Sequence, residues 1–194
     1  MKDNALELSQ QIEIWKKANN GNVFLVAVGD ASVGNTDVYI RRPDRYTIHA
    51  WLDEPSKEAK ENILFQNCVL DANIIATHEK GLTPKSEQII SSIASASSEL
   101  IVELFDPKGE LTEEKGEITL TFNGNKYVLN RLDRSSSCRH SDLLRDSSKA
   151  AADYILKPYL KTYPELKTND ELYFVFLRAL KELKVKPEYS LKKL

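Results

Sequence analysis

Apolar residues recur along much of this chain at the spacing of an amphipathic helix. Over residues 4–19, Ala5, Leu8, Ile12 and Trp15 are three or four positions apart, with charged residues between them. Asn19-Asn20-Gly21-Asn22 ends this predicted helix. The same spacing predicts further helices over 46–52, 57–70 and 86–104, a helical segment over 141–158, and a last helix that opens at Thr168 or Asn169 and runs to about 184.

Shorter apolar runs bounded by turn residues predict two β-hairpins. In the first, strands over 23–28 and 36–41 flank a turn region at 29–35 that contains two glycines. In the second, strands over 117–122 and 126–130 flank Asn123-Gly124-Asn125, a strong signal for a tight turn. Helices and hairpins together predict an α+β protein that is mostly helical.

Two stretches 89 positions apart have the same pattern, an apolar strand that ends in Arg-x-Asp-Arg. Val38-Tyr39-Ile40 leads to Arg42-Pro43-Asp44-Arg45, and Tyr127-Val128-Leu129 leads to Arg131-Leu132-Asp133-Arg134. In both halves the predicted order is hairpin, basic turn, helix, helix. We therefore predict two similar modules, residues 1–106 and 110–194, each with a β-hairpin followed by helices and joined by the linker Asp106-Pro107-Lys108-Gly109.

Composition and charge change this picture little. The chain is 41% hydrophobic and 29% charged, as is usual for globular proteins. The net charge is -2, with -6 on residues 1–110 and +4 on residues 111–194. This asymmetry favours contact between copies of the chain, or between its basic half and an acidic partner, although two solvated surfaces are the simpler explanation. We find no signal-peptide pattern and no long apolar run, and expect no membrane span.

The arginine turns are the best candidates for an interaction site, with Arg41, Arg42, Arg45, Arg131 and Arg134 as the residues involved. Paired guanidinium groups can hold a carboxylate or a phosphate. Alternatively, each aspartate caps the following helix while an arginine pairs with it locally. The second interpretation is favoured, because a fold-forming turn would recur in both halves whereas a catalytic site usually would not.

Other reactive residues do not assemble into a recognisable catalytic or metal-binding pattern. Cys68 lies in an apolar segment and is expected to be buried, whereas Cys138 lies in a serine-rich stretch that we predict to be a loop. A nucleophile at Cys138 would need an orienting partner, and none can be identified. His49, His78 and His140 lack metal-site spacing. We therefore expect no catalytic, cofactor-binding or metal-binding residues, and no enzyme.

Five basic residues fall within 19 positions, which raises the alternative of a small nucleic-acid-binding or regulatory protein. They are Arg131, Arg134, Arg139, Arg145 and Lys149. Asp133, Asp142 and Asp146 interleave with them, and the stretch lacks aromatic residues on which bases could stack. Nucleic acid is therefore not the expected partner. The lysine-rich end, 184–194, is interpreted as a solvated tail or as an arm that docks on a neighbour.

Three segments resemble small tailed-phage proteins of the tail-assembly-chaperone type. They are Val38-Tyr39-Ile40-Arg41-Arg42-Pro43, Ile63-Leu64-Phe65-Gln66-Asn67-Cys68-Val69 and Lys167-Thr168-Asn169-Asp170-Glu171-Leu172-Tyr173-Phe174. The resemblance implies a hairpin whose second strand ends in a basic-Pro step, followed by a helical bundle. Leu132 stands where the second copy would have that proline, and the duplication departs from the family's single domain.

The resemblance also implies a role without catalysis, in which the protein binds other phage proteins during morphogenesis. We therefore expect a bacteriophage morphogenesis or virion structural protein that acts in tail or head-tail assembly. Its expected partners are other phage structural or tail proteins, and self-association is left open. Its expected location is the host cytoplasm during assembly, with the virion as an open alternative.

Overall fold

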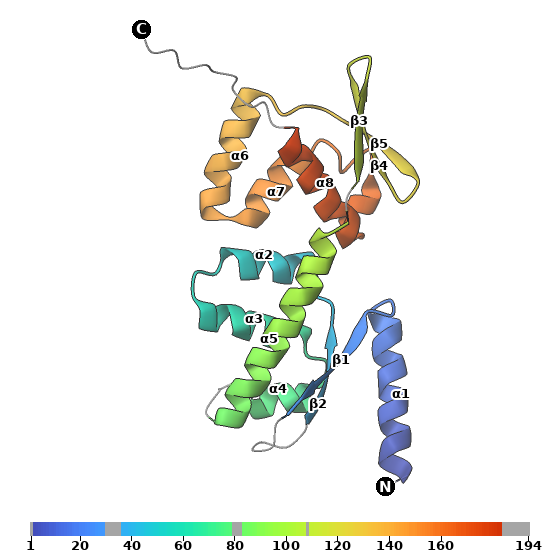
Figure 1. Ribbon diagram of the computed structural model, residues 1–194, viewed down its shortest axis with the longest axis vertical. Coiled ribbons are helices and arrows are strands. Elements are labelled where there is room, and N and C mark those ends of the chain that lie inside the picture. Colours follow the sequence, from blue (N-terminus) through green and yellow to red (C-terminus); the bar gives the residue numbers. More distant parts are fainter. Residues whose placement is uncertain (1, 30–35, 79–82, 108, 184–194) are drawn as a thin grey trace. The chain divides into compact units, whose positions relative to one another are not determined.

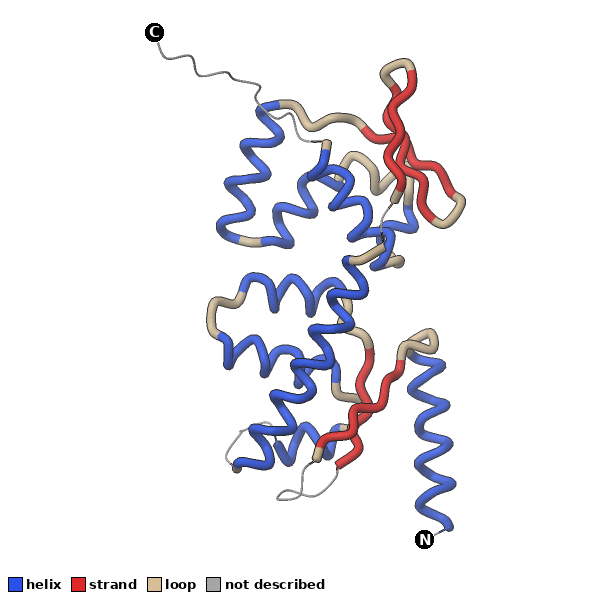
Figure 2. Tube along the Cα trace, in the orientation of Figure 1, coloured by secondary structure: helices blue, strands red, loops and turns tan. Residues whose placement is uncertain are grey.

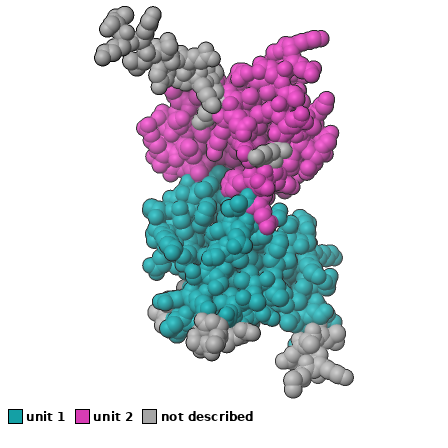
Figure 3. All heavy atoms as spheres, viewed as in Figure 1, with its two compact units in different colours: residues 1–102 teal, residues 103–194 magenta. Residues whose placement is uncertain are grey.

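The computed structural model describes residues 2–29, 36–78, 83–107 and 109–183, with the backbone alone for 2–6. As predicted, the fold is α+β and mostly helical, with one two-stranded and one three-stranded antiparallel sheet (Figure 1, Figure 2). The chain divides into two compact units, Met1–Val102 and Glu103–Leu194 (Figure 3). The similarity of two modules stays a prediction. Residues 30–35 of the turn predicted at 29–35, and the tail at 184–194, lie outside the described residues.

The first unit begins with a helix that leads directly into a hairpin. The first helix, α1, spans Lys2–Ala18. Just after it, Asn20 and Gly21 have positive φ angles of 51° and 80°, which turn the chain into β1 (Val23–Val28). β1 pairs with β2 (Thr36–Arg41), with Val26 opposite Val38. The helices that follow are α2 (Arg45–Asp53), α3 (Lys57–Cys68), α4 (Ala72–His78) and α5 (Pro84–Phe105). α4 was not predicted, since no helix was expected between residues 70 and 86.

The core of the first unit joins β2 to three of these helices. Its fully buried side chains are Ile40 from β2, Ile48 from α2, Leu64, Phe65 and Cys68 from α3, and Ile89 and Ile93 from α5. Among the described residues α5 alone has the length and composition to cross a membrane, with a mean hydropathy of 1.2 over 18 residues. Such a helix is weak evidence for a span, because the core helix of a globular protein has the same composition.

The second unit opens with a three-stranded antiparallel meander. β3 (Glu110–Glu114) pairs with β4 (Glu117–Phe122), and β4 pairs with β5 (Asn125–Leu129). Two tight turns join the strands, Lys115-Gly116 and Asn123-Gly124, and both residues of each turn have positive φ, as a type I′ turn requires. The second of these turns was predicted, whereas β3 was not. The unit continues with α6 (Arg134–Asp146), α7 (Ser148–Leu156), the 3₁₀ helix η1 (Pro164–Lys167) and α8 (Asp170–Glu182).

Two predictions about the helices of this unit need correction. The serine-rich stretch around Cys138 is part of α6 and not a loop, because Asp133 caps the helix directly before it. The segment 141–158 is interrupted at Ser147, which ends α6 and caps α7. The start of the last helix was predicted with two alternatives, and Asn169 is the cap: its Oδ1 accepts a hydrogen bond from the Leu172 amide at 3.0 Å.

An aromatic cluster fills the core of the second unit beside β5. The ring of the fully buried Phe176 lies 5.1 Å from the ring of Tyr127 and 5.8 Å from those of Tyr159 and Tyr163. These contacts are edge-to-face or tilted, arrangements that aromatic pairs favour. Phe176 thus holds two tyrosines from the η1 region against the inner face of β5.

Candidate functional site: the two arginine turns

The first arginine turn, Arg41 to Arg45, is built around Asp44. Its Oδ1 accepts a hydrogen bond from the Thr47 amide at 2.8 Å and so caps α2. Its Oδ2 is 3.1 Å from Nη1 of Arg41, while Nε of Arg41 donates to the Asn67 carbonyl at 2.8 Å. Arg41 therefore ties the end of β2 both to the start of α2 and to the last turn of α3.

The pKa of Asp44 lies below its ordinary value. Partial burial acts to raise this pKa, but the hydrogen bonds from Thr47 and the positive charge of Arg41 together outweigh it. The carboxylate is thus ionised at neutral pH, and its oxygens are used by the cap and by Arg41. This geometry confirms the capping interpretation for the first turn.

The remaining arginines of this turn are also engaged within the protein. Arg45 is the first residue of α2 and is only 8% exposed, while Arg42 is half-buried. Both side chains have interaction partners in the structure. A ligand role for Arg41, Arg42 and Arg45 stays a prediction, and these contacts give each of them a structural role as well.

The second arginine turn, Arg131 to Arg134, has the same cap with different arginine contacts. Oδ1 of Asp133 accepts a hydrogen bond from the Ser136 amide at 2.7 Å, and Oδ2 accepts one from the Ser136 hydroxyl at 3.2 Å. These hydrogen bonds hold the pKa of Asp133 below its ordinary value. Nη2 of Arg131 donates to Oε2 of Glu113 on β3 at 2.6 Å, so this arginine pairs across the sheet and not with Asp133. Arg134 is exposed at the start of α6.

The outer edges of β2 and β5, the second strand of each hairpin, are closed by different groups. Beside β2, the Leu70 amide donates to the Tyr39 carbonyl at 2.9 Å, and Val69 forms a bridge with Ile40. Beside β5, no strand is present in the described part of the chain, and tyrosine hydroxyls accept from the backbone. The Val128 amide donates to Tyr163 at 2.9 Å, and the Asn130 amide donates to Tyr159 at 3.0 Å.

Neither tyrosine contact was predictable from the local sequence. The two tyrosines lie 35 and 29 positions from the amides that they contact, and no local motif connects the two segments. Burial raises the pKa of the Tyr159 hydroxyl, although its contact with Asn130 opposes the change.

The two cysteines differ in exposure. Cys68 is fully buried, and this burial raises the pKa of its thiol to about 11. Cys138 is exposed on α6, while His140, two residues further on, is buried. Side chains two positions apart on a helix point in nearly opposite directions. His140 is therefore not placed to activate the Cys138 thiol.

The three histidines are all buried, and each lies on a different helix, α2, α4 or α6. Nδ1 of His78 is 2.9 Å from the hydroxyl of Ser86, near the start of α5. Burial lowers the pKa of His78, and the positive charge of Lys85 lowers it further. Within the described ranges no group of three or more His, Cys, Asp or Glu side chains is placed to hold a metal ion.

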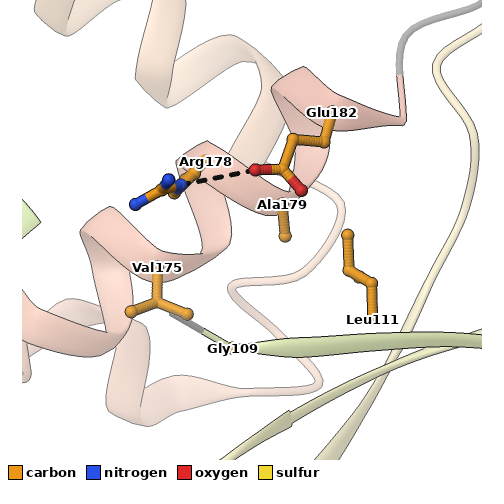
Figure 4. Close-up of a pocket in the computed structure, with 6 residues that line it drawn as sticks. All are labelled: Gly109, Leu111, Val175, Arg178, Ala179 and Glu182. Atoms are coloured by element: carbon orange, nitrogen blue, oxygen red, sulfur yellow. Dashed lines mark hydrogen bonds and ion pairs between the residues drawn. The ribbon is translucent and has the colours of Figure 1, made fainter. Parts of the chain in front are cut away.

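A small pocket of about 70 Å³ opens between the start of β3 and α8, in the second unit (Figure 4). Leu111, Val175 and Ala179 form its apolar lining. Arg178 and Glu182, 3.3 Å apart, form an ion pair beside it, and Nη1 of Arg178 also donates to the Phe105 carbonyl at 3.2 Å. Ligand pockets are usually several hundred Å³. This one has room for a single small side chain or a few waters.

Gly109 lines the same pocket and has a specific steric role. A Cβ atom at this position would lie 2.1 Å from Cδ1 of Leu120 and 3.0 Å from Cγ1 of Val175. Leu120 is fully buried and has little room to move aside. The linker therefore needs a residue without a side chain where it enters β3.

Comparison with known proteins gives no family for this chain. No protein-family model matches it, and neither does any curated protein or solved structure.

Proposed function

We propose that this protein is a non-catalytic morphogenesis or virion structural protein of a tailed bacteriophage, and that it binds other phage proteins during tail or head-tail assembly. The phage assignment comes from the resemblance of the first strand-and-turn segment and of the segments around Ile63 and Thr168 to tail-assembly chaperones. The binding role is supported by the surface of the first unit.

The main support is the unusual exposure of α1. Amphipathic helices normally bury their apolar stripe against the rest of the protein. No side chain of residues 7–18 is buried, and Leu8 and Ile14 are 45% and 59% exposed. The ring of Trp15 lies 5.7 Å from the ring of Tyr39 on β2. A helix with uncovered apolar residues is a common means of binding a groove on a partner protein.

The contacts of the arginine turns indicate a structural role for these turns, and leave α1 as the candidate for binding a partner. Asp44 and Asp133 are used as helix caps, and Arg41 and Arg131 as links between elements. Each turn therefore has a structural function that needs no ligand. Leu8 and Ile14 of α1 are, by contrast, exposed apolar side chains, and they are the better candidates for contact with a partner.

Affinity capture from phage-infected cells tests the proposal. The full chain carries a tag, and mass spectrometry identifies the phage proteins that co-purify with it. We expect a tail or head-tail protein to be enriched by the wild type and to be reduced by about tenfold or more in the variant Leu8→Ser/Ile12→Ser, because two apolar contacts are lost. Val128→Ser, at another exposed apolar position, is the matched control and retains the partner.

Two results would contradict the proposal. If the wild type captures no structural protein of the phage, the assembly role is wrong. If the Leu8→Ser/Ile12→Ser variant captures the same proteins in the same amounts, the role of α1 in binding is wrong.

One observation favours the alternative of a nucleic-acid-binding protein. Arg134 and Arg139 are exposed on α6, and Arg145 near its end is also exposed but 3.8 Å from Asp142. Retention on a DNA or RNA column should then fall steeply with salt, and Arg134→Ala/Arg139→Ala should reduce the salt dependence by about one or two released counterions. Elution at low salt, unchanged by these substitutions, rejects the alternative.

A further inference from the structure

β1 has an open outer edge that lacks the usual protection. Its six residues, Val23–Val28, contain neither a charged side chain nor a proline. Natural proteins commonly place charges or proline on edge strands, because unpaired backbone groups attract strands from other molecules. β2 lies on one side of β1, and no described strand lies on the other.

The hydrogen-bond pattern of the hairpin identifies the backbone groups at this edge. The Arg42 amide donates to the Asn22 carbonyl, so these two residues form a hydrogen-bonded pair. Such pairs alternate along an antiparallel ladder, and the outward groups of β1 are therefore those of Val23, Leu25 and Ala27. The Val23 amide already donates to the Gly21 carbonyl. Leu25 is 54% exposed and Ala27 is exposed, and their outward groups meet no strand in the described part of the chain.

The apolar core is also incomplete on the side of β1. Val38 and Ile40 on β2 are almost fully buried. Val26 and Phe24 lie directly opposite them on the same face of the hairpin, yet both are only half-buried. A further strand beside β1 would cover these two side chains and extend the core.

We propose that β1 of a second copy of this chain occupies this edge, antiparallel and about a two-fold axis at Val26. Leu25 then lies opposite Ala27 of the second copy, and Ala27 lies opposite its Leu25. The amides and carbonyls of these residues form four hydrogen bonds, which pair every outward group of Leu25 and Ala27 in both strands. The result is a continuous four-stranded sheet with β1 of each copy at its centre.

The placement of the free groups selects this register. A two-fold axis at Leu25 would place Ala27 opposite Val23, whose amide is already used by Gly21. With the axis at Val26, the amides and carbonyls of Leu25 and Ala27 in one copy meet the same four groups in the other. This axis also places Phe24 opposite Val28 on the core face, so that apolar side chains meet there.

The distribution of charge favours a second copy as the occupant. Two β1 strands bring no like charges together. The open side of β3 is different, because a two-fold axis at Thr112 would place Glu110 opposite Glu114 of a second copy in two places. A two-fold interface is also closed, so it yields a dimer and not a growing fibre. Self-association through β1 is independent of the phage function proposed above.

Sedimentation of the full chain tests the proposal with a pair of charge variants. At micromolar concentrations and above, the wild type should have twice the 22.0 kDa mass of the chain. Leu25→Glu/Ala27→Glu places like charges opposite each other twice and should raise the dissociation constant by about tenfold or more. Leu25→Lys/Ala27→Glu places opposite charges together in the proposed register and should retain the dimer. Val128→Glu, at an exposed strand position elsewhere, should also retain it.

Cross-linking gives a second readout that does not depend on the charge variants. Val26 of the two copies would form a non-hydrogen-bonded pair, with Cα atoms about 4.5 Å apart, which is within disulfide range. In a Cys138→Ser background, Val26→Cys should give a covalent dimer on mild oxidation, and Leu25→Cys should give much less. A monomeric wild type overturns the proposal, as does a dimer that Leu25→Glu/Ala27→Glu does not weaken. Equal cross-linking at 25 and 26 overturns the register.

Discussion

The two hairpin-and-turn segments, 23–45 and 117–134, use the same local structure in different surroundings. In each, the second strand buries alternate side chains, Val38 and Ile40 in the first and Tyr127 and Leu129 in the second. In each, an aspartate three residues before a hydrogen-bonded amide caps the next helix. The outer edge of this second strand differs, since backbone from 69–70 closes the edge of β2 and tyrosine hydroxyls close the edge of β5.

The matching arginines differ as well. Arg45 and Arg134 both begin a helix directly after the capping aspartate, yet Arg45 is buried and Arg134 is exposed. The cap depends on hydrogen bonds over three residues, which the local sequence specifies. Burial depends on which distant segments pack over the turn. The same short motif can therefore give one structure and two different surfaces.

The largest effect is expected from removing the aromatic support of the second hairpin. Phe176→Ala should lower the free energy of unfolding by about 3–5 kcal/mol, because it removes a fully buried ring that contacts three tyrosines. Native-state hydrogen exchange should become faster at the amides of Val128 and Asn130. Phe65→Ala, the matched change in the first unit, should instead make hydrogen exchange faster at the amide of Leu70. Equal acceleration of all three amides in both variants would contradict separate closure of the two edges.

Removing the caps should have a smaller effect, and a larger one in the first turn. Asp44→Ala should cost about 1–2 kcal/mol, since it removes a cap and leaves Arg41 without its carboxylate. Asp133→Ala should also destabilise the protein, but less, because Asp133 is exposed and Arg131 pairs with Glu113. Urea unfolding measures both. A greater loss from Asp133→Ala would reverse this ranking.

The caps also predict how stability depends on acid. The pKa of each aspartate is lowered by folding, so each contributes stability that is present above the ordinary value of 3.8 and is lost as the pH falls through the folded pKa. Asp44→Ala should therefore lose less stability than the wild type between neutral and acidic pH. An identical acid dependence in the two proteins would show that Asp44 is not involved.

The tyrosine contacts should contribute still less. Tyr159→Phe should cost about 0.5–1.5 kcal/mol, because the Asn130 amide loses its acceptor. Tyr163→Phe should cost less, since the Val128 amide is exposed and water can replace the hydroxyl. Urea unfolding measures the cost, and hydrogen exchange at Asn130 and Val128 assigns it. No change at these amides would contradict the proposed closure of the β5 edge.

Alkaline pH provides a test of the same region. Folding raises the pKa of Tyr127 and Tyr159 above the ordinary value of 10.0. The stability that these protonated side chains give to the folded protein is therefore fully present below pH 10.0, and it is lost as the pH rises through the folded pKa. Tyr159→Phe should reduce this loss. The absorbance of tyrosinate, followed together with circular dichroism, measures both ionisation and unfolding.

The smallest change in stability is expected at Cys138, although the two thiols should differ clearly in their rates of labelling. A thiol reagent at neutral pH should modify Cys138 quickly and Cys68 only after unfolding, because burial and a pKa of about 11 keep Cys68 protonated. Cys138→Ser should abolish the fast phase without changing the unfolding curve by more than about 0.5 kcal/mol. Two fast thiols in the wild type would contradict the burial of Cys68.

Local patterns predicted the parts of the fold that local interactions determine. The strands at 23–28, 36–41 and 117–122, the tight turn at Asn123-Gly124 and the caps were identified from spacing and turn chemistry. β3 was missed because its three glutamates are poor strand formers, and it is held by pairing with β4. The first turns of α6 were mistaken for a loop because serine commonly favours loops, while the cap from Asp133 starts a helix there.

The surfaces were less predictable, because they depend on contacts between distant segments. Nothing near Val128 in the sequence indicates that Tyr163 will accept its hydrogen bond. The same holds for Leu70 beside Tyr39. The five arginines were chosen for their charge, and their different burial follows from tertiary packing.

Gly109 has a consequence for the evolution of this chain. Any side chain at 109 would collide with Leu120, and so the two positions cannot change independently. Relatives that keep a large residue at 120 should keep glycine at 109, whereas a small residue at 120 would permit alanine or serine. A collection of related sequences should therefore show this pair varying together across the first two strands of the meander.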